Sequence, residues 1–249
     1  MPIATILFFF YDNKMDITLI TIGNSHVRFC QSNGKKFSHA KKIKTHILKK
    51  PSCFGLPHHT KKILALSVVP NATKLLQQFA KKHQIDLQIF ESRHYPYPNH
   101  TEKPKAVGGD RLLAALGAKK LAYQPPFIIV DVGTAITINF FDKNFGLEGG
   151  LILPSYHLMI ESLHQQTAQL PKPTSQKNLN DIWIGKTTEQ AMQKGCEAMF
   201  ENMMAQLHKK AKTDRRQLIT TGGGWRGTNK NYEPDILFHG LCYFNQLNS

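Results

Sequence analysis

Two stretches of the chain share one pattern and decide the fold. Residues 16–30 read Asp-Ile-Thr-Leu-Ile-Thr-Ile-Gly-Asn-Ser-His-Val-Arg-Phe-Cys, and residues 127–141 read Phe-Ile-Ile-Val-Asp-Val-Gly-Thr-Ala-Ile-Thr-Ile-Asn-Phe-Phe. In each stretch an apolar strand pattern runs into a small polar turn that contains glycine, and a second strand pattern follows. The sequence therefore predicts two β-hairpins, with turns at 22–25 and 132–135.

Strand and helix patterns alternate around these hairpins, which is typical of the α/β class. Further strands are predicted at 63–69, 87–90 and 218–221, and helices at 72–83, 112–121, 156–165, 184–210 and the C-terminal end. A hairpin that recurs within such an alternation indicates two related α/β halves. On spacing alone coincidence stays open, because the pattern strand, glycine, strand is common.

Composition excludes several classes of protein. The chain has 249 residues, of which 41% are hydrophobic and 20% charged, so it has enough apolar material for a core and is not a disordered chain. No apolar run approaches the roughly 20 residues of a membrane span. The four cysteines form no C-x-x-C pair, which predicts reduced thiols in a cytoplasmic protein, with Cys30 and Cys196 in the core. Residues 1–15 are expected to form an N-terminal extension without the features of a signal peptide.

The charge is concentrated in the first half of the chain. Residues 1–124 contain 20 Lys and Arg against 6 Asp and Glu, a net +14, whereas residues 125–249 contain 12 against 11, a net +1. This excess has two explanations, a phosphate-rich partner or a solvated lysine-rich surface. Nucleic acid is not favoured, because no aromatic-interleaved basic stripe or helix-turn-helix pattern is present.

The segment Gly108-Gly109-Asp110-Arg111 precedes a predicted helix and is the first candidate site. Glycines allow close approach of a ligand to the backbone, and a helix N-terminus attracts anions. Asp110 could accept a hydroxyl proton as a general base, while Arg111 binds a carboxylate or phosphate. The alternative is that Asp110 only caps the helix.

Two further glycine turns follow. Asp131 ends a strand just before Gly133 and Thr134, where a carboxylate can hold a cation and the turn can bind phosphate oxygens; ordinary turn chemistry is the alternative. Residues 220–224, Thr-Thr-Gly-Gly-Gly, suit a nucleotide base or ribose. The histidines lack the spacing of metal ligands, so no metal site is expected there. The three glycine segments, at 108–111, 131–134 and 220–224, indicate a ligand-binding site more specifically in this order than any one of them does alone.

Over about residues 16–241 the chain resembles the type III pantothenate kinases, a family of the actin-like ATPase superfamily. The resemblance rests on short motifs that occur in order: Ile22-Gly23-Asn24-Ser25, Ser67-Val68-Val69-Pro70, Gly108-Gly109-Asp110-Arg111, Asp131-Val132-Gly133-Thr134-Ala135-Ile136-Thr137, Gly149-Gly150-Leu151-Ile152-Leu153-Pro154, Thr167-Ala168-Gln169-Leu170-Pro171, Ile184-Gly185-Lys186-Thr187-Thr188 and Thr221-Gly222-Gly223. It implies two duplicated ribonuclease H-like (actin-like ATPase) halves, 16–113 and 114–249, with a central cleft.

The resemblance also implies an activity. Proteins of this family phosphorylate the terminal hydroxyl of pantothenate with ATP, giving 4'-phosphopantothenate in the first step of coenzyme A biosynthesis. Asp110 would be the catalytic base, and the residues expected to contact pantothenate are Gly108, Gly109, Asp110, Arg111 and Thr188. Thr188 would do so from a helical segment at the interface of a homodimer.

The nucleotide and its cations are assigned in the same way. The ATP-binding residues implied by the resemblance are Gly23, Asn24, Ser25 and Thr134. Asp131 would hold the monovalent cation, potassium or ammonium, that acts beside magnesium in this family.

The chain departs from the family pattern at three positions. Thr21 and Asn139 occupy positions where the family has aspartate, and Thr101 occupies the position of a substrate-contacting tyrosine, for which Tyr95 or Tyr97 could substitute if the proline-rich loop 92–107 folds back. Two other functions therefore stay open: a catalytically impaired relative with a regulatory or nucleic-acid-associated role, and a kinase for a different small alcohol.

Overall fold

The chain forms two compact units, each with its own β-sheet. The computed structural model describes residues 15–57, 59–173, 183–225, 227 and 230–248, so that all of the expected N-terminal extension except Met15 lies outside the described residues. One unit comprises residues 1–124, 143–148 and 235–249, and the other comprises 125–142 and 149–234. The chain is thus a mixed α/β protein with two sheets. None of the described helices combines the length and apolar character needed to cross a bilayer.

The sheet of the first unit confirms the first predicted hairpin. Its strand order is β3-β2-β1-β4-β5, with β1 at Ile17–Ile22, β2 at His26–Ser32, β3 at Lys41–Lys44, β4 at Lys62–Ser67 and β5 at Asp86–Ile89. β1 and β2 pair antiparallel around the turn, with Ile22 opposite Val27. β4 is parallel to β1, and β5 is parallel to β4. The carboxyl ends of β1, β4 and β5 therefore lie at the same edge of this sheet.

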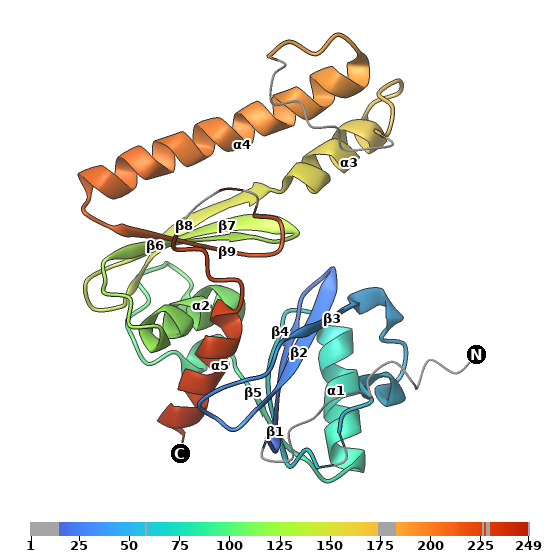
Figure 1. Cartoon of the computed structure of the whole chain (residues 1–249), viewed down its shortest axis with the longest axis vertical. Helices are drawn as coiled ribbons and strands as arrows, with labels where there is room; N and C mark the ends of the chain where they lie inside the picture. The colour runs from blue at the N-terminus through green and yellow to red at the C-terminus, as the bar shows by residue number, and fades with distance from the viewer. Residues whose placement is uncertain (1–14, 58, 174–182, 226, 228–229, 249) are drawn as a thin grey trace. The chain divides into compact units, whose positions relative to one another are not determined.

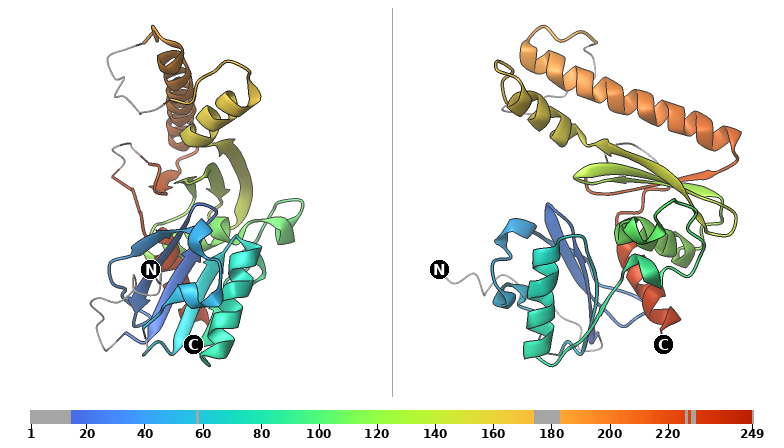
Figure 2. Two further views of the ribbon diagram at one scale, coloured as in Figure 1. Left: turned by 90° about the vertical axis from the view of Figure 1, so that its right-hand side faces the viewer. Right: turned by 180° about the vertical axis from the view of Figure 1, so that it is seen from behind.

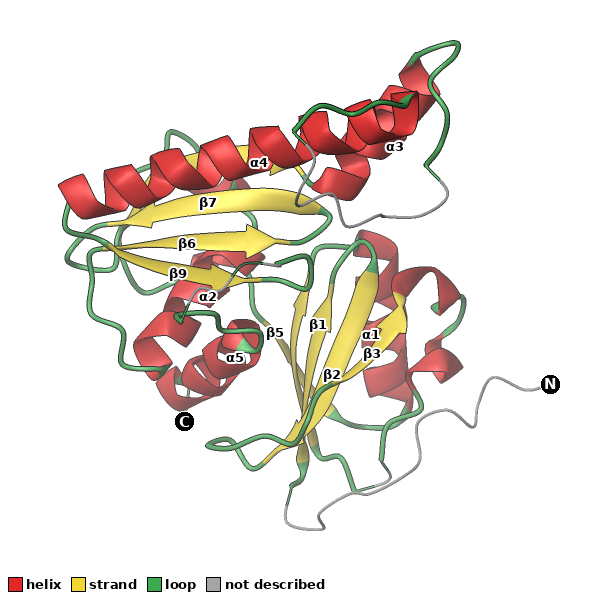
Figure 3. Ribbon diagram, turned by 45° about the horizontal axis from the view of Figure 1, so that its top comes forward, coloured by secondary structure: helices red, strands yellow, loops and turns green. Residues whose placement is uncertain are grey.

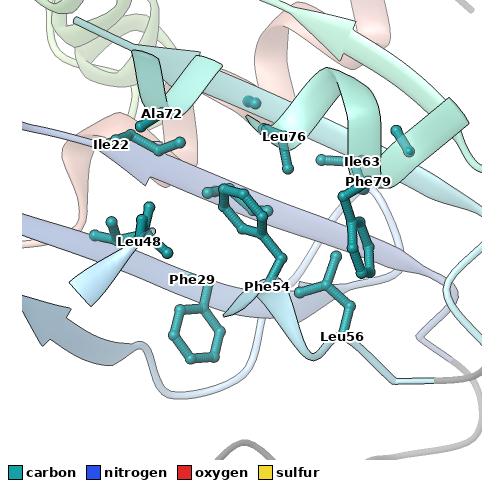
Figure 4. Close-up of a cluster of buried hydrophobic side chains, with 13 residues drawn as sticks. Ile22, Phe29, Leu48, Phe54, Leu56, Ile63, Ala72, Leu76 and Phe79 are labelled. Atoms are coloured by element: carbon teal, nitrogen blue, oxygen red, sulfur yellow. The ribbon is translucent and has the colours of Figure 1, made fainter. Parts of the chain in front are cut away.

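Helix α1 (Pro70–Lys82) covers one face of this sheet, called the α1 face below. Leu76 and Phe79 of the helix pack with Ile20 and Ile22 of β1 and with Phe54 (Figure 4). Proline suits the first position of a helix, where its missing N–H has no partner to lose. Fully burying one such aliphatic or aromatic side chain contributes about 1.5–3 kcal/mol, so this cluster holds the helix on the sheet.

Helix α5 (Ile236–Leu247) packs on the opposite face, called the α5 face, together with α2 (Gly109–Lys120) (Figures 1 and 3). The guanidinium of Arg28 on β2 pairs with the Asp235 carboxylate just before α5, and it lies 5.1 Å from the ring centroid of Phe238. The C-terminal helix therefore completes the first unit, although it is far in sequence from the strands of that unit.

The second unit has the strand order β8-β7-β6-β9, with β6 at Phe127–Val132, β7 at Ala135–Phe141, β8 at Leu147–Pro154 and β9 at Gln217–Thr221. β6 and β7 pair antiparallel around the second predicted turn, and β9 is parallel to β6. The second hairpin is thereby confirmed. An antiparallel hairpin whose first strand also pairs with a parallel strand is present in both units.

Two helices belong to the second unit. α4 (Thr188–Thr213) packs Met204, Leu207 and Ala211 against side chains of β6 and β7. α3 (Tyr156–Gln166) lies beside the N-terminal half of α4, and its Ile160 packs in a small cluster with Met192 and Cys196 (Figure 2). Cys30 and Cys196 are both buried, as predicted.

The sequence patterns miss some elements. β3 reads Lys-Lys-Ile-Lys and β8 contains Gly149-Gly150, so neither shows the apolar alternation by which strands are recognised. The helix predicted to begin at 184 begins at Thr188, because the Thr187 hydroxyl accepts the Gln190 N–H at 3.2 Å and caps it.

Candidate functional site

The turn of the first hairpin is held by backbone and side-chain hydrogen bonds. The Gly23 N–H donates to the His26 carbonyl at 2.9 Å. Thr45, which follows β3, donates its N–H to the Ser25 carbonyl at 3.1 Å and its hydroxyl to the Gly23 carbonyl at 2.6 Å. The side chains of Asn24 and Ser25 remain exposed. The turn is therefore fixed in shape, and its two polar residues stay accessible at the end of the hairpin.

The Gly108–Arg111 segment forms the start of α2, close to the ends of β4 and β5. A Cβ placed on Gly109 would lie 3.2 Å from Leu66 Cδ1 and 3.6 Å from the Phe90 carbonyl oxygen. Glycine at this position lets the first turn of the helix approach the carboxyl edge of the sheet, where ligands bind in open α/β sheets. Asp110 is thus carried to that edge.

The carboxylate of Asp110 lies over Gly108. A Cβ on Gly108 would be 2.5 Å from Asp110 Oδ1, and the same oxygen accepts the Arg111 N–H at 2.9 Å. The N-cap position is Gly108, so Asp110 is not the helix cap that the alternative interpretation required. Burial of the Arg111 guanidinium lowers its pKa, and the neighbouring Asp110 carboxylate opposes that shift. A carboxylate and a half-buried cation thus lie side by side on the first turn of α2.

The first unit brings two predicted site segments to one edge of its sheet. The turn 23–25 follows β1, and Gly109 packs against Leu66 near the end of the adjacent strand β4. The Val68 N–H donates to the Ile22 carbonyl at 3.0 Å, which keeps the end of β4 against the end of β1. One sheet edge therefore carries both the turn expected to bind phosphates and the expected general base.

The second unit brings together two turns that the sequence showed only as separate motifs. Asp131 and Thr221 are paired in the parallel ladder of β6 and β9, so both strands end at the same edge. Gly222, at a φ of 94°, lies directly against the Asp131 carboxylate, and the Gly224 N–H donates to the Val132 carbonyl at 2.9 Å. The glycine segment after β9 thus closes around the carboxylate that ends β6.

The other predicted residues of this unit lie on turns and helix ends. Gly133 donates its N–H to the Ala135 carbonyl at 3.0 Å, which leaves the Thr134 side chain exposed at the tip of the hairpin. Thr188 is the first residue of α4 and is exposed. The predicted site residues therefore form two groups, one built within each unit.

The donors around Asp131 suit a hard monovalent cation. A half-buried carboxylate lies beside the carbonyl of Val132, and oxygen atoms are the ligands that such ions prefer. No group of three or more His, Cys, Asp or Glu that could hold a metal ion occurs in the part of the chain that the structure describes. The expectation for the histidines stays a prediction, and His58 lies outside the described residues.

Sequence reasoning missed Thr45 and the lysines of β3. Both belong to a segment without apolar alternation, and only the pairing of β3 with β2 places Lys44 opposite His26, next to the first turn. The positive charge of this segment is the signal that could have found it.

Comparison with known proteins identifies the family. A family model for type III pantothenate kinase matches residues 17–210. The chain belongs to the type III pantothenate kinase family. Proteins named type III pantothenate kinase include one from Phenylobacterium zucineum, 32% identical over 187 residues that cover 70% of this chain and 71% of the relative. Another, from Thermosipho melanesiensis, is 29% identical over 244 residues that cover 91% and 96%.

Two solved structures have a fold similar to that of this member of the type III pantothenate kinase family. A Campylobacter jejuni protein assigned to the Baf family of transcriptional activators has a TM-score of 0.63 at 19% identity, covering 93% of this chain and 98% of its own. A Listeria monocytogenes protein assigned as an N-acetylmannosamine kinase has a TM-score of 0.57 at 13% identity, covering 94% and 100%. At these identities the similarity shows the fold alone.

The structure shows the burial and the partners of the residues that depart from the family pattern. Thr21 is 6% exposed and pairs across the hairpin with Arg28. Asn139 is buried and donates its amide N–H to the Thr137 hydroxyl at 3.2 Å.

At the position of the family's tyrosine, Thr101 donates its hydroxyl to Asn99 Oδ1 at 2.8 Å. Tyr95 is buried, and its hydroxyl donates to the Phe145 carbonyl at 2.5 Å, so this tyrosine holds the proline-rich loop against residues 143–148.

Proposed function

We propose that this chain transfers the terminal phosphoryl group of ATP to the terminal hydroxyl of pantothenate. The observation that carries the proposal is the position of Asp110: in a chain of this family, it lies on the first turn of α2, at the sheet edge where the turn 23–25 also lies. A carboxylate at this edge can accept the proton of a hydroxyl that attacks a phosphate held beside it.

Little covalent chemistry is needed for this transfer. Phosphoryl transfer depends mainly on in-line positioning of the two substrates and on positive charge around the phosphoryl oxygens. We assign Asp110 as the general base and Arg111, with Gly108 and Gly109, to the binding of pantothenate, whose carboxylate suits a guanidinium. The half-buried position of Arg111 strengthens such a contact, because the local dielectric constant is lower than in water.

ATP is assigned to the two hairpin turns. Gly23, Asn24 and Ser25 would bind its phosphates, and Thr134 would contact the nucleotide from the second unit. The corresponding strand orders, β3-β2-β1-β4 and β8-β7-β6-β9, support the interpretation that the units are duplicated actin-like ATPase halves. The domain boundaries at 113 and 114 and the central cleft stay predictions.

A monovalent cation, potassium or ammonium, is assigned to Asp131. Its oxygen donors fit such an ion, which would add positive charge near the nucleotide when bound. Asp131 would hold the ion, and the glycine segment 222–224 would shape the space around it. The magnesium ion expected with ATP has no comparable carboxylate at the first hairpin, where the corresponding position is Thr21.

We also propose a homodimer formed through the second unit, with Thr188 near its interface. Large apolar side chains are exposed there on β8, on α3, on α4 and just before α4: Leu151, Ile152, Leu158, Trp183, Ile184 and Met199. Monomeric proteins rarely expose so many large apolar groups in one part of the structure, and a second copy of the chain would cover them. A cytoplasmic location is supported by the four cysteines, all of which are free thiols.

The test is an assay of ADP release with and without pantothenate, magnesium and potassium. Wild-type protein is expected to release ADP only when pantothenate is present, and Asp110→Asn to lower kcat by about 10²–10⁴-fold. Asp86→Asn is the matched control, because Asp86 is exposed at the start of β5, at the opposite edge of the same sheet. Absence of turnover in the wild type at millimolar substrates and with every cation would overturn the proposal.

A second candidate function is a catalytically impaired relative that binds a regulatory partner or nucleic acid. Thr21, Asn139 and the net charge of +14 in residues 1–124 favour it. Salt-sensitive retardation of DNA without kinase activity would support this function. A kinase for a different small alcohol is distinguished by running the same assay over a panel of alcohols.

A further inference from the structure

The two hairpins are alike in fold but opposite in charge. Asp131 lies two residues before the glycine of the second turn and pairs across the hairpin with Thr137. At the equivalent position of the first hairpin is Thr21, which pairs with Arg28. The acidic position of one hairpin is thus a neutral hydroxyl beside a guanidinium in the other.

Two lysines of β3 extend this positive charge. Val27 and Ile43 pack in the core on the α1 face, and side chains alternate along a strand, so His26, Arg28, Lys42 and Lys44 belong to the opposite, α5 face. The register pairs Arg28 with Lys42 and His26 with Lys44. Arg28, Lys42 and Lys44, called the basic cluster below, therefore share one face of the first sheet.

The basic cluster lies next to the first turn. Lys44 is opposite His26, which accepts the N–H of Gly23, and Thr45, the next residue, holds the turn through two hydrogen bonds. The pKa of His26 is lowered, first by burial and then by the charges of Lys42 and Lys44, in keeping with the register that sets Lys44 opposite His26. Helix α5 begins at Ile236, and the carboxylate of Asp235, just before it, pairs with Arg28 on β2.

No carboxylate balances the two lysines. Residues 17–85 contain no Asp or Glu at all. Asp235 is already paired with Arg28. Within the described residues neither Lys42 nor Lys44 has an ion-pair partner. Two unpaired cations beside a turn suited to phosphate are a site for an anion.

A divalent cation does not fit the same place. Proteins hold magnesium through one or two carboxylates together with substrate phosphates, whereas the first hairpin offers one buried hydroxyl next to three cationic side chains. Like charges on neighbouring residues repel each other, so the basic cluster disfavours a divalent cation beside it. The positive charge that an acid-held metal would supply is already present in the basic cluster.

We propose that Lys42 and Lys44 are ATP-binding residues that contact the phosphates of the nucleotide at the turn 23–25, in place of a divalent cation held by the first hairpin. The inference rests on the proposed function, because it takes ATP as the ligand of that turn. It adds two binding residues from a strand outside the family motifs, and it predicts that this chain binds the nucleotide without magnesium.

The experiment measures binding of ATP, AMP and adenosine to the full-length protein by calorimetry, in magnesium and in EDTA. Wild-type protein is expected to bind ATP in both buffers with affinities within about threefold. The double variant Lys42→Ala/Lys44→Ala should lose about tenfold or more in ATP affinity and nothing for adenosine, because only charged hydrogen bonds to phosphate are removed. The matched control is Lys81→Ala/Lys82→Ala, which removes the same charge from the exposed end of α1.

Three results would overturn the inference. In the first, the double variant binds ATP as the wild type does. In the second, wild-type protein binds ATP only when magnesium is present. In the third, the lysines affect retention of DNA but not ATP affinity, which would make the basic cluster a polyanion surface. Wild-type turnover with unchanged ATP binding in the double variant would reject this inference alone, whereas absence of both turnover and ATP binding in the wild type would reject the proposed function as well.

Discussion

The carboxylate of Asp131 occupies the space that a side chain on Gly222 would need. Asp131 lies in β6 and Gly222 directly follows β9, and the parallel pairing of these two strands brings the residues together. Gly222 also has a φ of 94°, which other residues rarely adopt. The proposed cation site therefore depends on a glycine that the sequence shows only as one of three in a row.

Gly222→Ala is expected to displace Asp131 and to strain the turn. The free energy of unfolding should fall by about 1 kcal/mol or more, and the potassium concentration for half-maximal turnover should rise. Denaturant unfolding and potassium titration of the assay measure both effects. Gly195→Ala is the control, since a Cβ at that exposed position of α4 meets no atom within 4 Å. Equal behaviour of the two variants would contradict the role of Gly222.

Gly108→Ala is expected to act on catalysis more than on stability. Its φ of −58° suits alanine, and the obstacle to a Cβ is the Asp110 carboxylate at 2.5 Å. Because that side chain can rotate away, the fold should be retained, while misplacement of the base should lower kcat by about 10²-fold. Steady-state kinetics should show little change in KM for ATP. An unchanged kcat would argue against Asp110 as the base.

The core on the α1 face predicts a large loss of stability for Leu76→Ala. Leu76 of α1 is 0% exposed and packs in the cluster with side chains of β1 and β4. Truncation should lower the free energy of unfolding by about 2–5 kcal/mol, measured in denaturant. Gln78→Ala, at an exposed position of the same helix, should change it by less than about 0.5 kcal/mol. A small effect for Leu76→Ala would mean that α1 is not held by this core.

His26 provides a titration test of the charges around the first turn. Burial and then the two lysines lower its pKa, so the folded protein favours the neutral ring. Its contribution to stability is complete above the ordinary histidine value of about 6.5 and is lost as the pH falls through the lowered pKa. Lys42→Ala/Lys44→Ala should raise the pKa of His26 in an NMR titration. No change would mean that the lysines do not act on this ring.

The proposed homodimer can be tested at Ile152, which is 67% exposed on β8. Ile152→Glu places a charge on the apolar surface that a second copy would cover, and burial of an unpaired charge is costly. Light scattering should find a dimer for the wild type and a monomer for the variant. Leu247→Glu, at an exposed position of the first unit, should leave the dimer intact. A monomeric wild type would overturn the homodimer.

The sequence by itself determined those elements of this protein that carry a local signal. Both hairpins and the helix predicted at 72–83, which is α1, follow from apolar periodicity and glycine turns, because these signals act between residues near in sequence. The family motifs likewise marked Asp110 and Asp131 as candidate residues.

Tertiary structure decided what lies beside what. Three features depend on contacts between segments distant in the chain: the contact of Asp131 with Gly222, the completion of the first unit by α5 and the position of the β3 lysines at the first turn. Strand order and register create those contacts, and no local pattern encodes them: a strand reading Lys-Lys-Ile-Lys gains its place only by pairing with its neighbour.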